Sequence, residues 1–85
     1  MRVKVYDNGG ATVDRYTVLY LDSPMTRERG KGFDSVGMSA APFHPQGVCQ
    51  HGEALPGKHL GKRIQFEQLP DDCQKLVRKD LEMQS

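Results

Sequence analysis

The start of the chain alternates between hydrophobic and polar residues with the two-residue period of a β-strand. Val3 and Val5 share one face of the first such segment. A second segment, residues 14–21, is apolar at both parities, which predicts a central strand covered on both sides. A glycine-rich turn signal at residues 8–10 separates the two segments. Together these patterns predict an antiparallel hairpin over residues 2–21.

Two weaker strand signals follow later in the chain. In residues 33–39, Val36 and Met38 share a face, but Gly37 between them disfavours a strand. In residues 62–67, apolar side chains recur at alternate positions. The sheet is therefore predicted to contain three or four antiparallel strands.

The clearest local signal is a helix near the C-terminus. Pro70 suits the first position of a helix, and Asp71 and Asp72 suit the positive end of its dipole. Apolar residues then recur at helical spacing, at Cys73, Leu76, Val77 and Leu81. This pattern predicts a helix from residue 70 to about 83, packed on one face of the sheet. The predicted fold class is α+β.

Residues 39–61 form the longest segment without a clear periodic pattern. They hold all three histidines, one of the two cysteines, three prolines and four glycines, and only Glu53 and Lys58 are charged. A loop of this length in a compact domain is usually functional or disordered. Proline lowers the entropy lost on ordering, and glycine lets a backbone approach a ligand closely. The segment is interpreted as a long, stiffened recognition loop.

Composition narrows the class of protein. A chain of 85 residues predicts a single domain, 1–85, with a small core, so a homo-oligomer or a tight binder is expected. The net charge of +1 argues against nucleic acid as a partner. No apolar run is long enough to span a membrane. Two cysteines do not make a disulfide framework, which favours a reducing cytoplasm.

Ligand or partner binding is the favoured interpretation of the loop. It supplies hydrogen-bonding groups and an aromatic face, and basic residues on either side can neutralise phosphate. The expected partner is a host protein or a nucleotide signal. The predicted binding residues are Ser39, Phe43, His44, Gln46, Gln50, His51, Arg27, Arg29, Lys62 and Arg63. A loop that folds on itself for stability remains open as an alternative.

Metal binding and catalysis are two further interpretations. Zinc accepts imidazole nitrogen and thiolate sulfur, which His44, Cys49, His51 and His59 together offer. Their spacing lacks the tight ligand pair that usually begins a structural zinc site, so no cofactor is the first expectation. A small hydrolase using Cys49 with His51 or His44 is the third interpretation, and a non-enzyme is expected.

Several short patterns resemble small proteins of bacteriophages and other bacterial mobile elements. They are YDNGG at residues 6–10, DRYTV at 14–18, PFHPQG at 42–47 and LGKRI at 60–64. The resemblance brings no known activity and no site residues. It implies a small accessory protein in the cytoplasm of a bacterial host, and such proteins often disarm host defences as inhibitors or nucleotide sponges. The resulting hypothesis is a non-catalytic binding protein with a possible counter-defence role.

Overall fold

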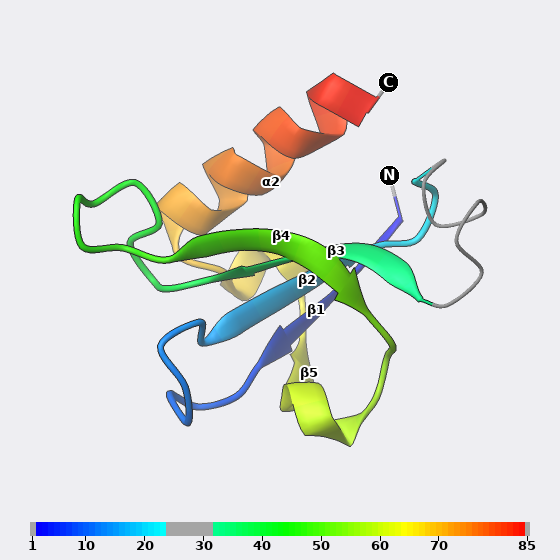
Figure 1. The fold of residues 1–85 in the computed structure, drawn as a ribbon, viewed down its shortest axis with the longest axis horizontal. Helices are drawn as coiled ribbons and strands as arrows, with labels where there is room; N and C mark the ends of the chain where they lie inside the picture. The colour runs from blue at the N-terminus through cyan, green and yellow to red at the C-terminus, as the bar shows by residue number, and fades with distance from the viewer. Residues whose placement is uncertain (1, 24–31, 85) are drawn as a thin grey trace.

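The computed structural model describes residues 2–23 and 32–84, which form an α+β fold (Figure 1). A single antiparallel sheet has the strand order β4-β3-β2-β1-β5, and one C-terminal helix, α2, packs on it. The strands are β1 (Val3–Asp7), β2 (Tyr16–Tyr20), β3 (Phe33–Met38), β4 (Cys49–Ala54) and β5 (Lys62–Ile64). Short 3₁₀ helices, η1 (Lys58–Leu60) and η2 (Phe66–Gln68), flank β5, and α2 spans Asp71–Gln84. The α+β prediction is confirmed, but the sheet has five strands instead of three or four.

The predicted N-terminal hairpin is present. β1 pairs antiparallel with β2, from Val3 opposite Tyr20 to Asp7 opposite Tyr16. The connection between the two strands is longer than a two-residue turn. The Asn8 side chain organises its first residues. Its Oδ1 atom accepts hydrogen bonds from the backbone N–H groups of Gly10 (2.9 Å) and Ala11 (3.0 Å).

The additional strand, β4, lies inside the segment interpreted as one irregular loop. Residues 49–54 pair with β3 over its whole length, so residues 39–61 are a hairpin turn, a strand and a return connection. The prediction of a continuous loop was wrong because β4 is an edge strand with five exposed residues out of six. A strand that buries little does not need an alternating apolar pattern. β5 is also shorter than predicted, since Phe66 begins η2 instead of continuing the strand.

The main hydrophobic core lies between the sheet and α2. Val5, Val18 and Val36 occupy directly opposed positions on three neighbouring strands, so their side chains share one face. Cys73 and Val77 of α2 pack against this face and are fully buried. The predicted helix is confirmed, with its beginning and its end each one residue later.

The other face of the sheet has a smaller buried patch. Leu19 of β2 is fully buried although it points away from the main core, and Tyr6 of β1 is also buried on that side. β2 is the middle strand of the five and is covered on both faces, as its apolar pattern predicts. We call this second side the open face, because no helix in the described part of the chain packs on it.

Within residues 2–23 and 32–84, no helix has the length and apolar character needed to cross a membrane.

A candidate binding cleft on the open face of the sheet

The predicted loop residues separate into three places. Phe43, His44 and Gln46 lie in the turn between β3 and β4, where Phe43 is half-exposed. The backbone N–H of His44 donates to Ala41, and the N–H of Gln46 donates to the His44 ring Nδ1 at 3.1 Å. His44 therefore hydrogen-bonds within its own turn, as the self-folding alternative expects.

Ser39 closes the base of this turn. Its Oγ accepts a hydrogen bond from the Val48 backbone N–H at 3.0 Å, and its own N–H donates to the Val48 carbonyl. The Ser39 carbonyl also accepts a hydrogen bond from the buried Cys73 thiol, with 3.2 Å between sulfur and oxygen. These bonds give Ser39 a structural role, because its hydroxyl already accepts a hydrogen bond from Val48.

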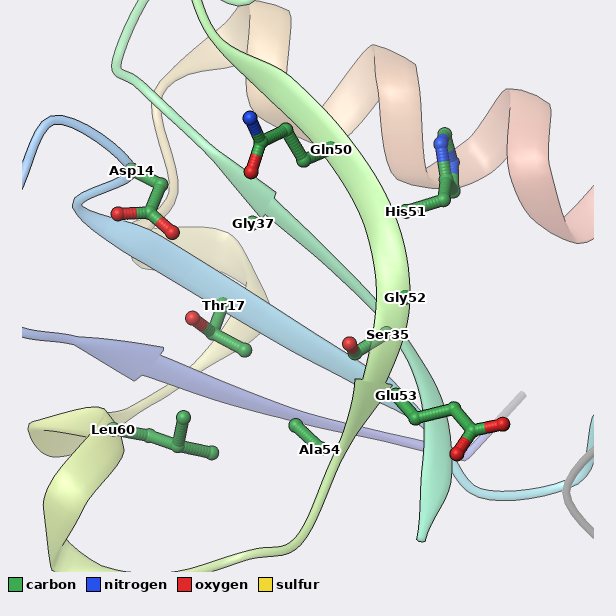
Figure 2. Close-up of a pocket in the computed structure, with 10 residues that line it drawn as sticks. All are labelled: Asp14, Thr17, Ser35, Gly37, Gln50, His51, Gly52, Glu53, Ala54 and Leu60. Atoms are coloured by element: carbon green, nitrogen blue, oxygen red, sulfur yellow. The ribbon is translucent and has the colours of Figure 1, made fainter. Parts of the chain in front are cut away.

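His51 of β4 points toward α2, away from the open face (Figure 2). Its Nε2 lies 2.8 Å from Asp80 Oδ2, and the Tyr20 hydroxyl donates to the same oxygen at 2.6 Å. Burial, followed by the hydrogen bond to Asp80, raises the pKa of Tyr20 well above its ordinary value. Asp80 is 29 residues from His51 along the chain, and no sequence motif marks the pair.

The two thiols are not activated. Burial, and then the negative charge of Asp80, raises the pKa of Cys49, and burial raises that of Cys73 to about 11. A nucleophilic cysteine needs the opposite shift, toward the thiolate. The Cys49 side chain also lies on the helix side of β4, because it pairs with Met38 of the main core.

The four residues proposed as zinc ligands do not converge. His44 is in the β3–β4 turn, Cys49 and His51 are on β4, and His59 is in η1. Among residues 2–23 and 32–84, no group of three or more His, Cys, Asp or Glu side chains could hold a metal ion. This placement gives no support to a zinc module on these four residues.

A cleft of about 240 Å³ opens on the open face, across β2, β3 and β4 (Figure 2). Thr17, Gly37 and Gln50 lie opposite one another on these strands, and Ser35 lies opposite Gly52 in the next position. The two glycines leave the backbone of the sheet exposed as a floor. The lining residues are Asp14, Thr17, Ser35, Gly37, Gln50, His51, Gly52, Glu53, Ala54 and Leu60.

Three polar side chains border the cleft without a hydrogen-bond partner among the described residues: Thr17, Ser35 and Gln50. Ser35 stands out because only 7% of its surface is exposed. No buried side-chain oxygen or nitrogen atom among the described residues lacks a hydrogen-bond partner, so the unpartnered Ser35 hydroxyl must itself open to the cleft. It is therefore accessible to a molecule in the cleft.

Asp14 supplies negative charge at one end of the cleft. Its Oδ1 accepts a hydrogen bond from the Thr12 hydroxyl at 2.6 Å, which fixes the carboxylate. Its Oδ2 faces Gly37, and a Cβ atom placed on Gly37 would lie 3.0 Å from that oxygen. Glycine at this position therefore leaves room for the carboxylate above the sheet.

The opposite end of the cleft is mainly apolar, although Glu53 also lines it. Leu60 of η1 faces Ala54 of β4, because the connection after β4 returns across the open face to β5 (Figure 2). A wider hollow of about 500 Å³ adjoins this end and includes Leu55 and His59. The site therefore combines a charged end, hydroxyl and amide groups, and an apolar end.

Of the eight predicted binding residues that the structure describes, only Gln50 and His51 line the cleft, and the His51 ring turns away from it. Arg63 lies on the open face with its guanidinium 5.9 Å from the centre of the Tyr6 ring, while Lys62 opposes Asp7 on the other face. Arg27 and Arg29 fall outside the described residues. Sequence reasoning missed Asp14, Thr17 and Ser35, because each lies within or beside a predicted strand and belongs to no motif.

Comparisons with known proteins leave the functional argument to this geometry. No protein-family model matches the chain, and searches of curated proteins and of solved structures find no match.

Proposed function

We propose that this chain is a small, non-catalytic binding protein that holds a partner protein at the cleft on the open face. The observation that carries the proposal is the Ser35 hydroxyl, which belongs to a residue only 7% exposed, opens to the cleft and has no hydrogen-bond partner among the described residues. Thr17 and Gln50 present further polar groups beside it. A bound molecule that satisfied these groups would gain hydrogen bonds at little cost in protein ordering.

Binding without catalysis is supported by the state of the reactive side chains. Cys49 has a raised thiol pKa and lies on the far side of β4 from the cleft. The His51 ring is hydrogen-bonded to Asp80 on that same far side. Among the described residues that line the cleft, neither hydroxyl group is hydrogen-bonded to a side chain that could act as its base, an arrangement that acyl or group transfer requires.

The charge of the cleft favours a protein over a nucleotide as the bound partner. Asp14 faces into it, and no lysine or arginine is among the described residues that line it. Recognition of phosphate relies on cationic side chains or on backbone N–H groups at a helix N-terminus. A carboxylate in this position repels phosphate and attracts the positively charged side chains of a protein.

The resemblance to proteins of bacteriophages and mobile elements supports a setting for this activity. We propose that the partner is a host protein in the bacterial cytoplasm and that binding inhibits a defence system. The test is to express the chain in hosts that each carry one defence system and to measure the plating efficiency of a restricted phage. The wild-type chain is expected to restore plating in one such host.

The variant Gly52→Val tests whether the restoration of phage plating depends on the cleft. A Cβ atom at Gly52 meets nothing within 4 Å, so a larger side chain at this position would extend into the cleft. Gly52→Val should fail to restore plating, whereas Lys79→Ala, on the exposed side of α2, should restore it like the wild type. Restoration by Gly52→Val would contradict a role for the cleft, and no restoration by the wild type would contradict counter-defence.

Self-association through β4 is a second proposal, supported by its position at the edge of the sheet. β4 pairs with β3 on one side, and no other described strand pairs with it on the other. An edge strand presents backbone N–H and C=O groups to which a further strand can bond. The edge strand β5 carries Lys62 and Arg63, which discourage such pairing, while β4 carries only Glu53.

A further inference from the structure

We propose that the cleft recognises the side chain of an arginine residue presented by the partner protein. This inference rests on the proposed binding function and names the chemistry of its ligand. It depends on three properties of the cleft: the charge at one end, the acceptors along the floor, and the apolar surface at the other end.

The charge selects a cation. The Asp14 carboxylate is held by Thr12 through Oδ1, which leaves Oδ2 directed over Gly37. Hydrogen bonds between a carboxylate and a charged donor are shorter and stronger than those between neutral groups. A neutral or anionic ligand would leave this oxygen with no positively charged partner among the described residues that line the cleft.

The spread of acceptors selects a guanidinium over an ammonium. Thr17, Ser35 and Gln50 lie on three neighbouring strands, β2, β3 and β4. Neighbouring strands are about 4.8 Å apart, so one compact ammonium cannot reach groups on all three. A guanidinium carries five N–H donors in one plane, which suits several acceptors at different places.

The floor and the apolar end suit the shape of arginine. Gly37 and Gly52 bring no side chain above the sheet, and the space over Gly52 is open. A planar guanidinium can therefore lie close to the backbone. The three methylene groups of the side chain would cover Leu60 and Ala54, as long basic side chains commonly cover apolar surfaces.

The test is a titration followed by the backbone amide signals of the ¹⁵N-labelled protein. The probes are N-acetyl-arginine methylamide, its uncharged citrulline analogue, the lysine equivalent, free L-arginine and AMP. The arginine probe should shift the amides of Ser35, Gly37 and Gly52. The citrulline and lysine probes should each bind at least about tenfold more weakly than the arginine probe. Citrulline lacks the positive charge, and lysine lacks the planar array of N–H donors.

Two variants check that the cleft is responsible. Asp14→Asn keeps the acceptor for Thr12 but removes the charge, and should weaken the arginine probe on the order of tenfold. Gly52→Val should abolish its effect by filling the site. Asp22→Asn, an exposed carboxylate beyond the other end of β2, is the matched control and should bind like the wild type.

Several outcomes would overturn the inference. If the citrulline probe binds as tightly as the arginine probe, the cleft does not recognise positive charge. If AMP shifts the same amides, the cleft binds an anion. Tighter binding of free arginine than of the blocked probe would assign it to the amino acid instead of a protein. If the arginine probe fails to bind while Gly52→Val still fails to restore phage plating, the partner-binding proposal stands and the arginine inference alone is wrong.

Discussion

Asp80 joins the sheet to the helix through two hydrogen bonds that end on one carboxylate oxygen. Tyr20 of β2 donates at 2.6 Å, and His51 of β4 approaches at 2.8 Å. Only 15% of the Asp80 side chain is exposed, so water competes weakly for this oxygen. His51, which the sequence predicts to be part of a binding loop, thus holds the edge strand β4 against α2.

Tyr20→Phe should lower the free energy of unfolding by about 1.5–3 kcal/mol, the usual contribution of a hydrogen bond to a charged group. Urea denaturation at neutral pH measures this change. Tyr6→Phe is the matched control, because the Tyr6 hydroxyl has no hydrogen-bond partner among the described residues. Equal losses in the two variants would contradict a specific role for the Tyr20–Asp80 bond.

The same bond predicts a loss of stability at alkaline pH. Burial and Asp80 raise the pKa of Tyr20 in the folded chain above the ordinary value of 10.0. A raised pKa stabilises the fold fully below pH 10 and loses this effect as the pH rises further, because the unfolded tyrosine ionises first. Urea denaturation at increasing pH should show a steeper decline above pH 10 for the wild type than for Tyr20→Phe.

The elements differ in how much of their structure the local sequence could indicate. α2 and the β1–β2 hairpin have strong signals, since their apolar residues recur at the period of the element and turn or cap residues mark their ends. β4 has no such signal, because it is exposed and contains Gly52 and a mainly polar sequence. Its pairing with β3 determines that it is a strand.

Leu76→Ala tests the packing of α2. The residue is buried in the main core, so its loss should lower the free energy of unfolding by about 2–5 kcal/mol. Met83→Ala, in the same helix but 77% exposed, should change it by less than about 0.5 kcal/mol. Chemical denaturation of both variants measures the difference, and a small effect of Leu76→Ala would contradict the packing described here.

Gly61→Ala tests how β5 joins the sheet. Gly61 has a φ angle of 106°, and an added Cβ would lie 2.6 Å from the Asn8 Cα atom. Backbone strain alone should cost about 1–3 kcal/mol, and the collision adds to it. Gly52→Ala is the matched glycine control, since its Cβ meets no atom within 4 Å, and similar melting temperatures for the two variants would be contrary to this prediction.

In the described residues, the whole molecule has one covered sheet face, one open face and two edge strands, of which β4 carries fewer charged residues than β5. The helix covers Val5, Val18 and Val36, while the open face carries the cleft. A chain of 85 residues buries a smaller share of its surface than a larger domain, so association at an edge adds useful burial. The cleft and the β4 edge are separate surfaces that can be tested separately.

Pairing of two copies through β4 should give a dimer whose fraction rises with concentration. Light scattering coupled to size-exclusion chromatography, under reducing conditions, measures the mass. Cys49→Lys places a charge on the exposed edge strand and should shift the equilibrium toward monomer. Lys75→Ala, on the exposed side of α2, should not. A monomeric wild type at every concentration tested would refute self-association.

The sequence by itself determined the fold class, the N-terminal hairpin, the doubly covered central strand and the C-terminal helix. These follow from periodicity and from turn and cap residues, which act over a few neighbouring positions. Only the tertiary structure decided that residues 49–54 form an edge strand and that His51 meets Asp80. It also assembled Asp14, Thr17, Ser35 and Gln50 into one cleft, because strand pairing and register place side chains that are far apart in the chain on one face.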